Sequence, residues 1–365
     1  DRLAPGLAPE LRGLLVLLTR WCSLIVLGRG LEGALRGVLH AHRRFLVPAI
    51  AGFLVSGSVI AMVWAFAPSY GVKALAWGIA AGNLLPLVVM FPVAWRAAPW
   101  RLARVASHPA LGRMARLVPW FVGIEVAGLA MPLVDRVIAV RMLEPGAISA
   151  LSYARALADV PVTLLAMTVA TVLFPSLAVH AARAEREVFQ ETLRRGVRAV
   201  VVLLLPVACL LVVLPDSLVR ALYERWAFGP EGTALTGAAL AAYGAGLLFL
   251  GIAAPLIQAA YAAGRVRYLL GIRLGGLATK VLLSLVLAPV LGHVGLALAT
   301  GGAFLMVSLA LIPALNGGWR GLVPDLRIVL PGLLLAVGLA LVADRALERI
   351  PGEGFLKPWL IPVGS

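Results

Sequence analysis

Charged side chains inside apolar segments are the residues of this sequence best suited to bind a ligand. Lys280 lies near the middle of the apolar run 268–290, and Arg155 lies in another run, four residues before Asp159. Glu125 lies in the apolar run before that one. Because a charge facing lipid is costly, such residues usually face a bundle interior or a water-filled cavity. Arg155 and Lys280 are therefore candidate ligands of a phosphate group. Asp159 and Glu125 are candidate supporting acids, or ligands of a coupling cation.

A second charged set lies near the start of the chain. Arg29, Glu32 and Arg36 are spaced i, i+3 and i+7, which places them on one face of a helix. Arg29 and Arg36 are candidate cavity cations, with Glu32 as their supporting acid. The alternative is a ladder of ion pairs at the membrane interface, with arginine heads that snorkel to water. For every charge named so far, a purely structural ion pair between helices is the competing interpretation.

Motifs for catalysis and for metal binding are missing from the sequence. The five histidines and two cysteines lack metal-ligand spacing and any CxxC pair. The sequence also has no GxSxG, no DxD and no phosphate-cradling glycine loop followed by lysine. We therefore expect a protein that is not an enzyme and that holds no cofactor and no metal.

The segments that carry these charges are predicted to span a membrane. Hydrophobic residues make up 61% of the chain and charged residues 13%, with a mean hydropathy of +0.97, which excludes a soluble globule of 365 residues. Runs of about 20 apolar residues predict an all-α polytopic membrane protein with about ten transmembrane helices. The predicted helices are 11–39, 46–67, 71–96, 115–142, 145–178, 192–223, 233–262, 268–290, 293–315 and 327–345.

The net charge of +15 is explained by membrane topology rather than by nucleic acid. Arginine and lysine are concentrated in alternate connections between the predicted helices, such as 96–116 and 183–198. The positive-inside rule places these connections in the cytoplasm and both ends of the sequence outside. We therefore expect membrane lipids, and no nucleic acid, among the partners.

An internal repeat relates two three-helix blocks about 220 residues apart. With an offset of 223 residues, the matched pairs are Gly28 and Gly251, Arg44 and Arg267, and Gly52 and Gly275. With an offset of 221 residues, they are Gly71 and Gly292, and Leu75 and Leu296. Secondary transporters use such repeats to build a site between two moving halves. The helices between the blocks lack an upstream partner, so three helices are missing before the first one if the two halves are equal. The repeat therefore predicts either a fragment of a longer protein or a naturally shortened chain.

Several stretches resemble the MurJ/MviN lipid II flippase family of the multidrug/oligosaccharidyl-lipid/polysaccharide exporter superfamily. Their order and spacing carry the resemblance, which runs from about residue 5 to 325 and begins where the fourth helix of the family would. The stretches are LHAHRRF (39–45), ALAWG (74–78), DR (135–136), GAISAL (146–151), TVLFPSL (171–177), LYER (222–225) and LGHVGLA (291–297). One departure concerns the site: the position of the family's cavity arginine holds Ala156, and the positive charge stands at Arg155.

The resemblance implies a two-lobed flippase fold with a truncated N-lobe. Its expected domains are a partial N-lobe of three helices over 1–105, a C-lobe of six helices over 106–318, and an extra helix and tail over 319–365. The implied function is translocation of lipid II, a polyprenyl-diphosphate-linked saccharide, across the bacterial cytoplasmic membrane by alternating access. Cell-wall synthesis proteins are candidate partners. The alternatives are an O-antigen or exopolysaccharide repeat-unit flippase, and a non-transporting membrane scaffold derived from such a transporter.

Overall fold

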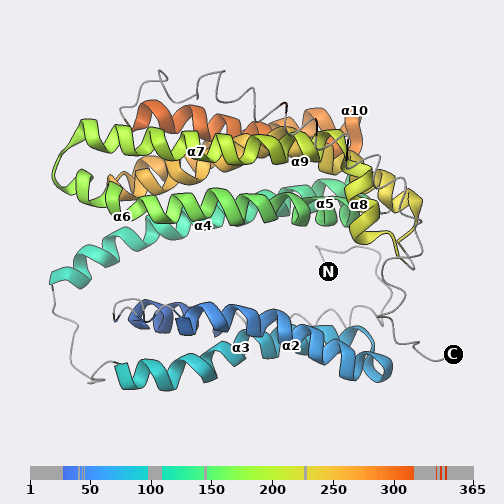
Figure 1. Cartoon of the computed structure of the whole chain (residues 1–365), viewed down its shortest axis with the longest axis horizontal. Helices are drawn as coiled ribbons and strands as arrows, with labels where there is room; N and C mark the ends of the chain where they lie inside the picture. Colours follow the sequence, from blue (N-terminus) through green and yellow to red (C-terminus); the bar gives the residue numbers. More distant parts are fainter. Residues whose placement is uncertain are drawn as a thin grey trace. The chain divides into compact units, whose positions relative to one another are not determined.

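The computed structural model describes residues 28–39, 42, 44, 46–97, 109–143, 146–225 and 228–315, together with the single positions 334, 338 and 342. The chain forms two compact units, Asp1–Ser107 and His108–Ser365 (Figure 1). Most of the predicted helix 327–345 and the part of helix 11–39 before Gly28 lie outside the described residues, so the predicted total of ten helices stays a prediction.

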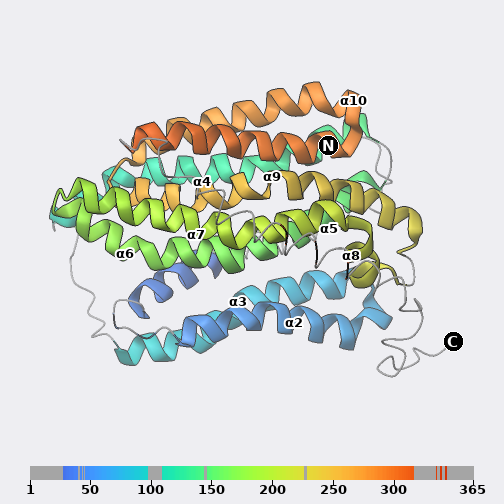
Figure 2. The same cartoon turned by 45° about the horizontal axis from the view of Figure 1, so that its top comes forward.

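The first unit contains a helical segment at 28–39 and the helices α2 (Leu46–Tyr70) and α3 (Val72–Ala97). A single residue, Gly71, joins α2 to α3 with a φ of +56°, a conformation that favours glycine. The two helices lie side by side in Figures 1 and 2. Their backbones approach closely because α3 carries Gly82, where an added Cβ would lie 2.8 Å from the carbonyl oxygen of Val55.

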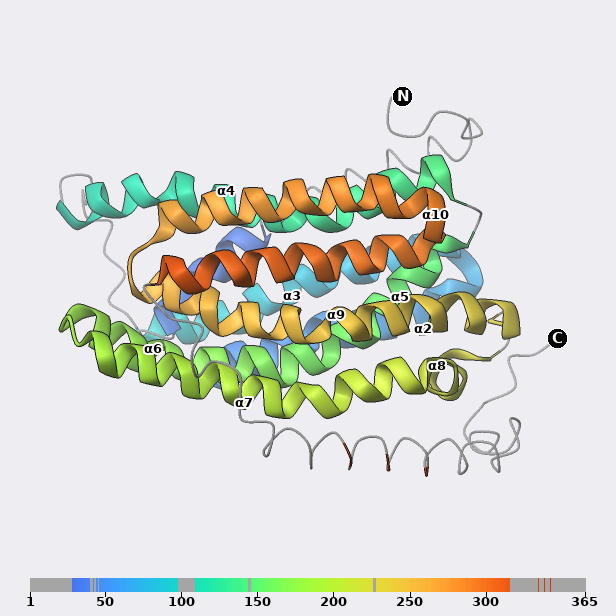
Figure 3. The ribbon, with the colours of Figure 1, turned by 90° about the horizontal axis from the view of Figure 1, so that it is seen from above.

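The second unit is a bundle of long helices that surround α9. Its elements, in chain order, are α4 (Pro109–Met142), α5 (Ala147–Pro161), the π-helix η2 (Val162–Met167), α6 (Thr168–Ala182), α7 (Arg186–Val213), α8 (Pro215–Tyr223), α9 (Pro230–Ala262) and α10 (Val266–Ala314). The central helix α9 packs against α5, α6, α7, α8 and α10. Figure 3 shows α9 running between α7 and α10. This position explains why 67% of the apolar part of α9 is buried, against 12% for α2.

Seven helices of the described part are long and apolar enough to cross a membrane. They carry apolar residues on all sides, so many large hydrophobic side chains, such as Phe53, Leu129 and Val290, are exposed in the isolated chain. An all-round apolar helix is typical of a membrane span rather than of a soluble bundle. The predicted all-helical polytopic membrane fold is therefore confirmed.

One predicted break between helices is confirmed, and two predicted helices differ from the helices of the structure. Gly292, with a φ of +60°, divides α10 into two arms that lie side by side in Figure 3, as the predicted break between 290 and 293 requires. The single predicted helix 192–223 is wrong, because the chain leaves the helical conformation at Leu214, just before Pro215. A residue before proline is disfavoured in the α region. The predicted helix 145–178 contains the unforeseen π-helix η2, which follows Pro161.

A close backbone contact inside the bundle joins α9 to the second arm of α10. Gly246 and Gly301 face each other there, and a Cβ added to Gly246 would lie 2.7 Å from the Cα of Gly301. Small residues let membrane helices approach closely. Because the hydrophobic effect does not drive helices together inside lipid, their association depends on such close packing. This contact fixes the second arm of α10, which carries Leu296 and Thr300, against the centre of the unit.

Candidate functional site

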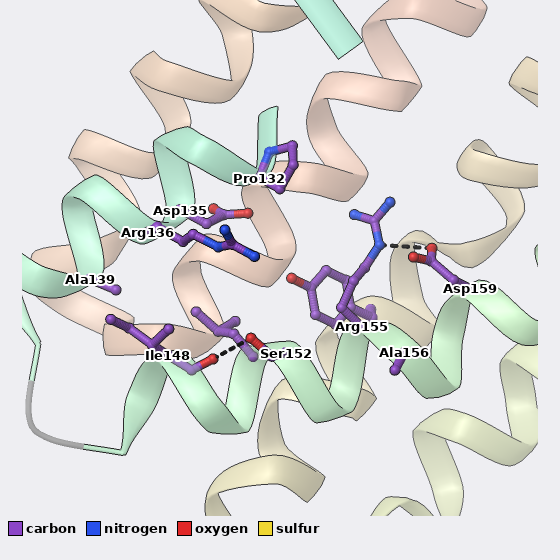
Figure 4. A pocket seen from close by; sticks show the side chains of 11 residues that line it. Pro132, Asp135, Arg136, Ala139, Ile148, Ser152, Arg155, Ala156 and Asp159 are labelled. Atoms are coloured by element: carbon purple, nitrogen blue, oxygen red, sulfur yellow. Dashed lines mark hydrogen bonds and ion pairs between the residues drawn. The ribbon is translucent and has the colours of Figure 1, made fainter. Parts of the chain in front are cut away.

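A cavity of about 280 Å³ opens between α4, α5 and α9 in the second unit (Figure 4). Its wall is mixed, with apolar side chains and a group of charged and hydroxyl-bearing ones. The lining residues are Pro132, Asp135, Arg136, Ala139, Ile148, Leu151, Ser152, Arg155, Ala156, Asp159 and Tyr243. Two arginines and two aspartates thus share one small space inside a bundle of membrane helices.

Arg155 and Asp159 form the wall of the cavity on α5. The Nε of Arg155 donates a hydrogen bond to Oδ1 of Asp159 at 2.7 Å, as the i, i+4 spacing predicts. The guanidinium lies over the ring of Tyr243 on α9, with 5.7 Å between Cζ and the ring centroid, within the range of a cation–π contact. Figure 4 shows the terminal nitrogens of Arg155 extending away from Asp159 into the open space. Arg155 is therefore oriented on one side and available on the other.

Arg136 and Asp135 form the opposite wall on α4. The side chain of Arg136 projects into the space between α4 and α5 in Figure 4, and the residue is exposed. The carboxylate of Asp135 lies beside it and is more enclosed, with 13% of its side chain exposed. The cavity therefore has a guanidinium on each of two facing helices.

Lys280 lies behind Asp135, outside the cavity lining. Its Nζ is 2.5 Å from Oδ1 of Asp135, and donates hydrogen bonds to the carbonyl oxygen of Leu296 at 2.6 Å and to Oγ1 of Thr300 at 2.7 Å. A lysine ammonium has three donors, so these three oxygens satisfy all of them. The side chain is fully buried. Lys280 thus has no donor left for a ligand and serves instead as the counter-charge of Asp135.

In the sequence, Asp135 and Arg136 stand out only as one of the stretches that resemble the family. In the structure, Asp135 lies inside α4, about two turns before the helix ends at Met142, and pairs with Lys280 of α10. Tyr243 and Ser152 were not predicted as lining residues either. A deep lysine requires an acidic partner, and this requirement was the only available signal for Asp135.

The predicted set Arg29, Glu32 and Arg36 is assembled in the first unit. Glu32 is buried, accepts a hydrogen bond from Nη2 of Arg36, and lies 3.6 Å from Nη1 of Arg29. Both arginines keep much of their side chains exposed, 60% for Arg29 and 41% for Arg36. This arrangement satisfies the acid and leaves two guanidinium groups accessible.

Glu125 does not line the cavity. It lies on the exposed face of α4, nearer the start of that helix, and interacts electrostatically with Arg273 of α10 and Tyr261 of α9. In the ranges that the structure describes, no group of three or more His, Cys, Asp or Glu side chains is placed to hold a metal ion.

The family model described as "Lipid II flippase MurJ" matches residues 1–347 of the chain. The chain belongs to the MurJ lipid II flippase family. It is 30% identical over 288 residues to the lipid II flippase MurJ of Burkholderia cenocepacia, covering 77% of this chain and 55% of the relative. It is 29% identical over 334 residues to the probable lipid II flippase MurJ of Rhizobium meliloti, covering 86% and 61%. The chain thus spans just over half the length of these two MurJ proteins.

Solved structures support the same fold. The structure of lipid II flippase MurJ in an inward closed conformation superposes with a TM-score of 0.74 at 20% identity, covering 94% of this chain and 76% of that one. A mutant of the Vibrio cholerae MATE transporter VcmN superposes with a TM-score of 0.67 at 15% identity, covering 85% and 71%. The predicted resemblance to the MurJ family is confirmed, and so is a multi-pass membrane protein of the MurJ fold.

Proposed function

We propose that the protein flips lipid II, a polyprenyl-diphosphate-linked saccharide, from the inner to the outer leaflet of the bacterial cytoplasmic membrane by alternating access. Membership of the MurJ family supports this proposal, because the family is one of flippases rather than of enzymes. The observation that carries it is the cavity of the second unit, in which Arg136 and Arg155 face each other among membrane helices. Two fixed cations suit a diphosphate.

The size of the cavity indicates which part of the substrate it would hold. A volume of about 280 Å³ is at the lower end of ligand pockets, which usually run from about 300 to 1,000 Å³. It would therefore take an anionic part of the headgroup rather than the whole saccharide and peptide. The polyprenyl tail would stay in the lipid, since leaving it would cost about 0.8 kcal/mol for each buried CH₂ group.

The charged groups outside the cavity have separate proposed roles. Arg29 and Arg36, held by Glu32, would provide further contacts for the anionic headgroup from the first unit. Lys280 would act through Asp135, because its own donors are already used. Glu125 and Asp159 are the proposed ligands of a coupling cation or, for Asp159, the support of Arg155. Cell-wall synthesis proteins are proposed partners, and catalysis is not part of the proposal.

A complementation experiment tests the proposed function. The full-length gene product would be expressed in bacteria depleted of their own lipid II flippase, next to Arg155→Ala and Lys280→Ala variants at matched membrane levels. Arg141→Ala is the matched control, because Arg141 is an exposed arginine of α4 outside the cavity lining. We expect rescue by the wild type and the control, and loss of rescue in Arg155→Ala.

The failure of rescue would separate the proposed cargoes. If the wild type inserts in the membrane but does not rescue growth, lipid II is not its cargo. Rescue of a strain that lacks an O-antigen repeat-unit flippase would then assign that class of saccharide. If the protein rescues neither strain and transports no lipid-linked saccharide in liposomes, the remaining alternative is a non-transporting membrane scaffold.

A further inference from the structure

Among the residues that the structure describes, Arg136 is the cavity cation that has no acid to offset its charge. Lys280 offsets the neighbouring Asp135, and Asp159 is hydrogen-bonded to Arg155. In the part of the chain that the structure describes, no ion pair joins Arg136 to a carboxylate. The cavity and the lysine behind it therefore hold three positive and two negative side chains. An ionisable residue inside a membrane span is by default a candidate functional residue.

The second guanidinium, Arg155, is only partly engaged. Asp159 takes the Nε side, and the terminal nitrogens extend into the open space in Figure 4. Arg136 extends into the same space from the facing helix. A guanidinium presents five donors in a planar fork, so two of them can surround one phosphate with several charge-assisted hydrogen bonds.

The two arginines belong to helices that are held together weakly. Consecutive in the chain, α4 and α5 each pack mainly on another helix, α4 on α10 and α5 on α9. The cavity occupies the space between them. An anion bound by both arginines would therefore bridge α4 and α5 as well as neutralise the excess charge.

We propose that Arg136 and Arg155 form a two-arginine clamp that holds a single phosphate-type group between α4 and α5. Lys280 supports the clamp from behind, because it neutralises the Asp135 carboxylate that would otherwise repel the anion. The clamp deepens the proposed function by naming the residues that hold the diphosphate of the lipid, and it rests on that function for the source of the phosphate. Arg136 contacts the ligand, whereas Asp159 is a positioning residue for Arg155.

The test measures binding by the full-length protein in nanodiscs with two probes, undecaprenyl diphosphate and inorganic pyrophosphate. Arg136→Ala, Arg155→Ala and the double variant are compared with the control Arg141→Ala. Each single substitution is expected to weaken binding about tenfold or more, since each removes charged hydrogen bonds. The double variant is expected to bind only slightly more weakly than whichever single variant has the lower affinity, because both arginines bind the same phosphate group. Arg136→Lys keeps the charge but loses the fork, so it is expected to recover only part of the affinity.

Ligand-induced stabilisation provides a second readout. A probe at about three times the wild-type Kd is expected to raise the melting temperature of the wild type and of Arg141→Ala, and to raise that of Arg136→Ala much less. An unshifted melting temperature without ligand shows that Arg136→Ala folds. If Arg136→Lys also folds, its binding can be measured even where the alanine variant cannot be purified.

The outcomes separate the clamp from the proposed function. The clamp is overturned if Arg136→Ala binds both probes as the wild type does, or if the effects of Arg136 and Arg155 simply add. Binding of the lipid without pyrophosphate assigns the clamp to a lipid-linked phosphate, and binding of both assigns it to the phosphate group itself. If lipid II transport fails while pyrophosphate binding still needs both arginines, the clamp stands and the proposed function falls.

Discussion

Two positive charges of the second unit, Lys280 and Arg155, have similar positions in the sequence and opposite environments in the fold. Both lie deep in an apolar helix. Lys280 is fully buried and has an oxygen acceptor for each of its three donors, whereas Arg155 keeps 33% of its side chain exposed and binds Asp159 through Nε. Depth in a membrane helix therefore does not show whether a cation can still bind a ligand. The number of donors left free shows it.

The largest expected effect concerns the buried pair. Asp135→Ala would leave the Lys280 ammonium without its carboxylate, and breaking a buried ion pair by removing one partner costs about 3–5 kcal/mol. The thermal unfolding midpoint of the purified protein in detergent should fall sharply. Asp159→Ala removes an acid from the partly exposed pair and should cost only about 0–1 kcal/mol. Equal losses in the two variants would contradict the contrast between the pairs.

The double variant Lys280→Met with Asp135→Leu sharpens the same comparison. Replacing both members of a buried ion pair by apolar residues of similar size is often neutral or stabilising. The hydrogen bond from Oγ1 of Thr300 to the carbonyl oxygen of Leu296 can remain without the lysine. The unfolding midpoint of the double variant should therefore exceed that of Asp135→Ala. A double variant as unstable as the single one would show that Lys280 stabilises the fold through more than its charge.

Helix packing should have an intermediate effect. Gly246→Ala would place a Cβ 2.7 Å from the Cα of Gly301, so α9 and α10 would have to separate, at a cost of about 1–3 kcal/mol. Gly271→Ala is the matched control on α10, because an added Cβ there would meet no atom within 4 Å. The two unfolding midpoints measure the difference. A loss for Gly271→Ala as large as that for Gly246→Ala would rule out close packing as the cause.

The smallest expected change in stability belongs to Arg155. Arg155→Ala removes a partly exposed ion pair, so unfolding in detergent should change by about 0–1 kcal/mol. Transport of fluorescent lipid II in liposomes should nevertheless fall strongly, since the variant loses a cavity cation. A variant that keeps full transport would remove Arg155 from the proposed site.

Local patterns in the sequence predicted the features that depend on local spacing. The Arg155–Asp159 pair follows from the i, i+4 rule, and the division of α10 follows from the repeat that aligns Gly292 with Gly71. Both glycines have a positive φ and both end a helix, which the alignment of two glycines made plausible. The family resemblance supplied the fold, because the order of several weak motifs is more specific than any one of them.

Features that depend on distant partners were beyond this kind of prediction. Lys280 contacts Asp135 only because α4 packs on the first arm of α10. The residues next to each of them in the sequence do not predict this partner. Arg136 faces the cavity because of how α4 is turned about its axis, which all-round apolar helices do not reveal. The π-helix η2 also lacks a signal other than Pro161, whose missing N–H frees a backbone acceptor.

The turns at Gly71 and Gly292 also determine how the chain can be probed from outside. Each glycine redirects the chain within one residue, so neither joint contains an extended segment that a protease could bind. Proteases cut, and inserted tags are tolerated, at exposed loop tips. We therefore expect no cleavage at either turn in limited proteolysis and no tolerance of epitope insertions there, whichever side of the membrane the turns face. Small thiol reagents directed at single cysteines placed beside these glycines are better suited to map the topology of this chain.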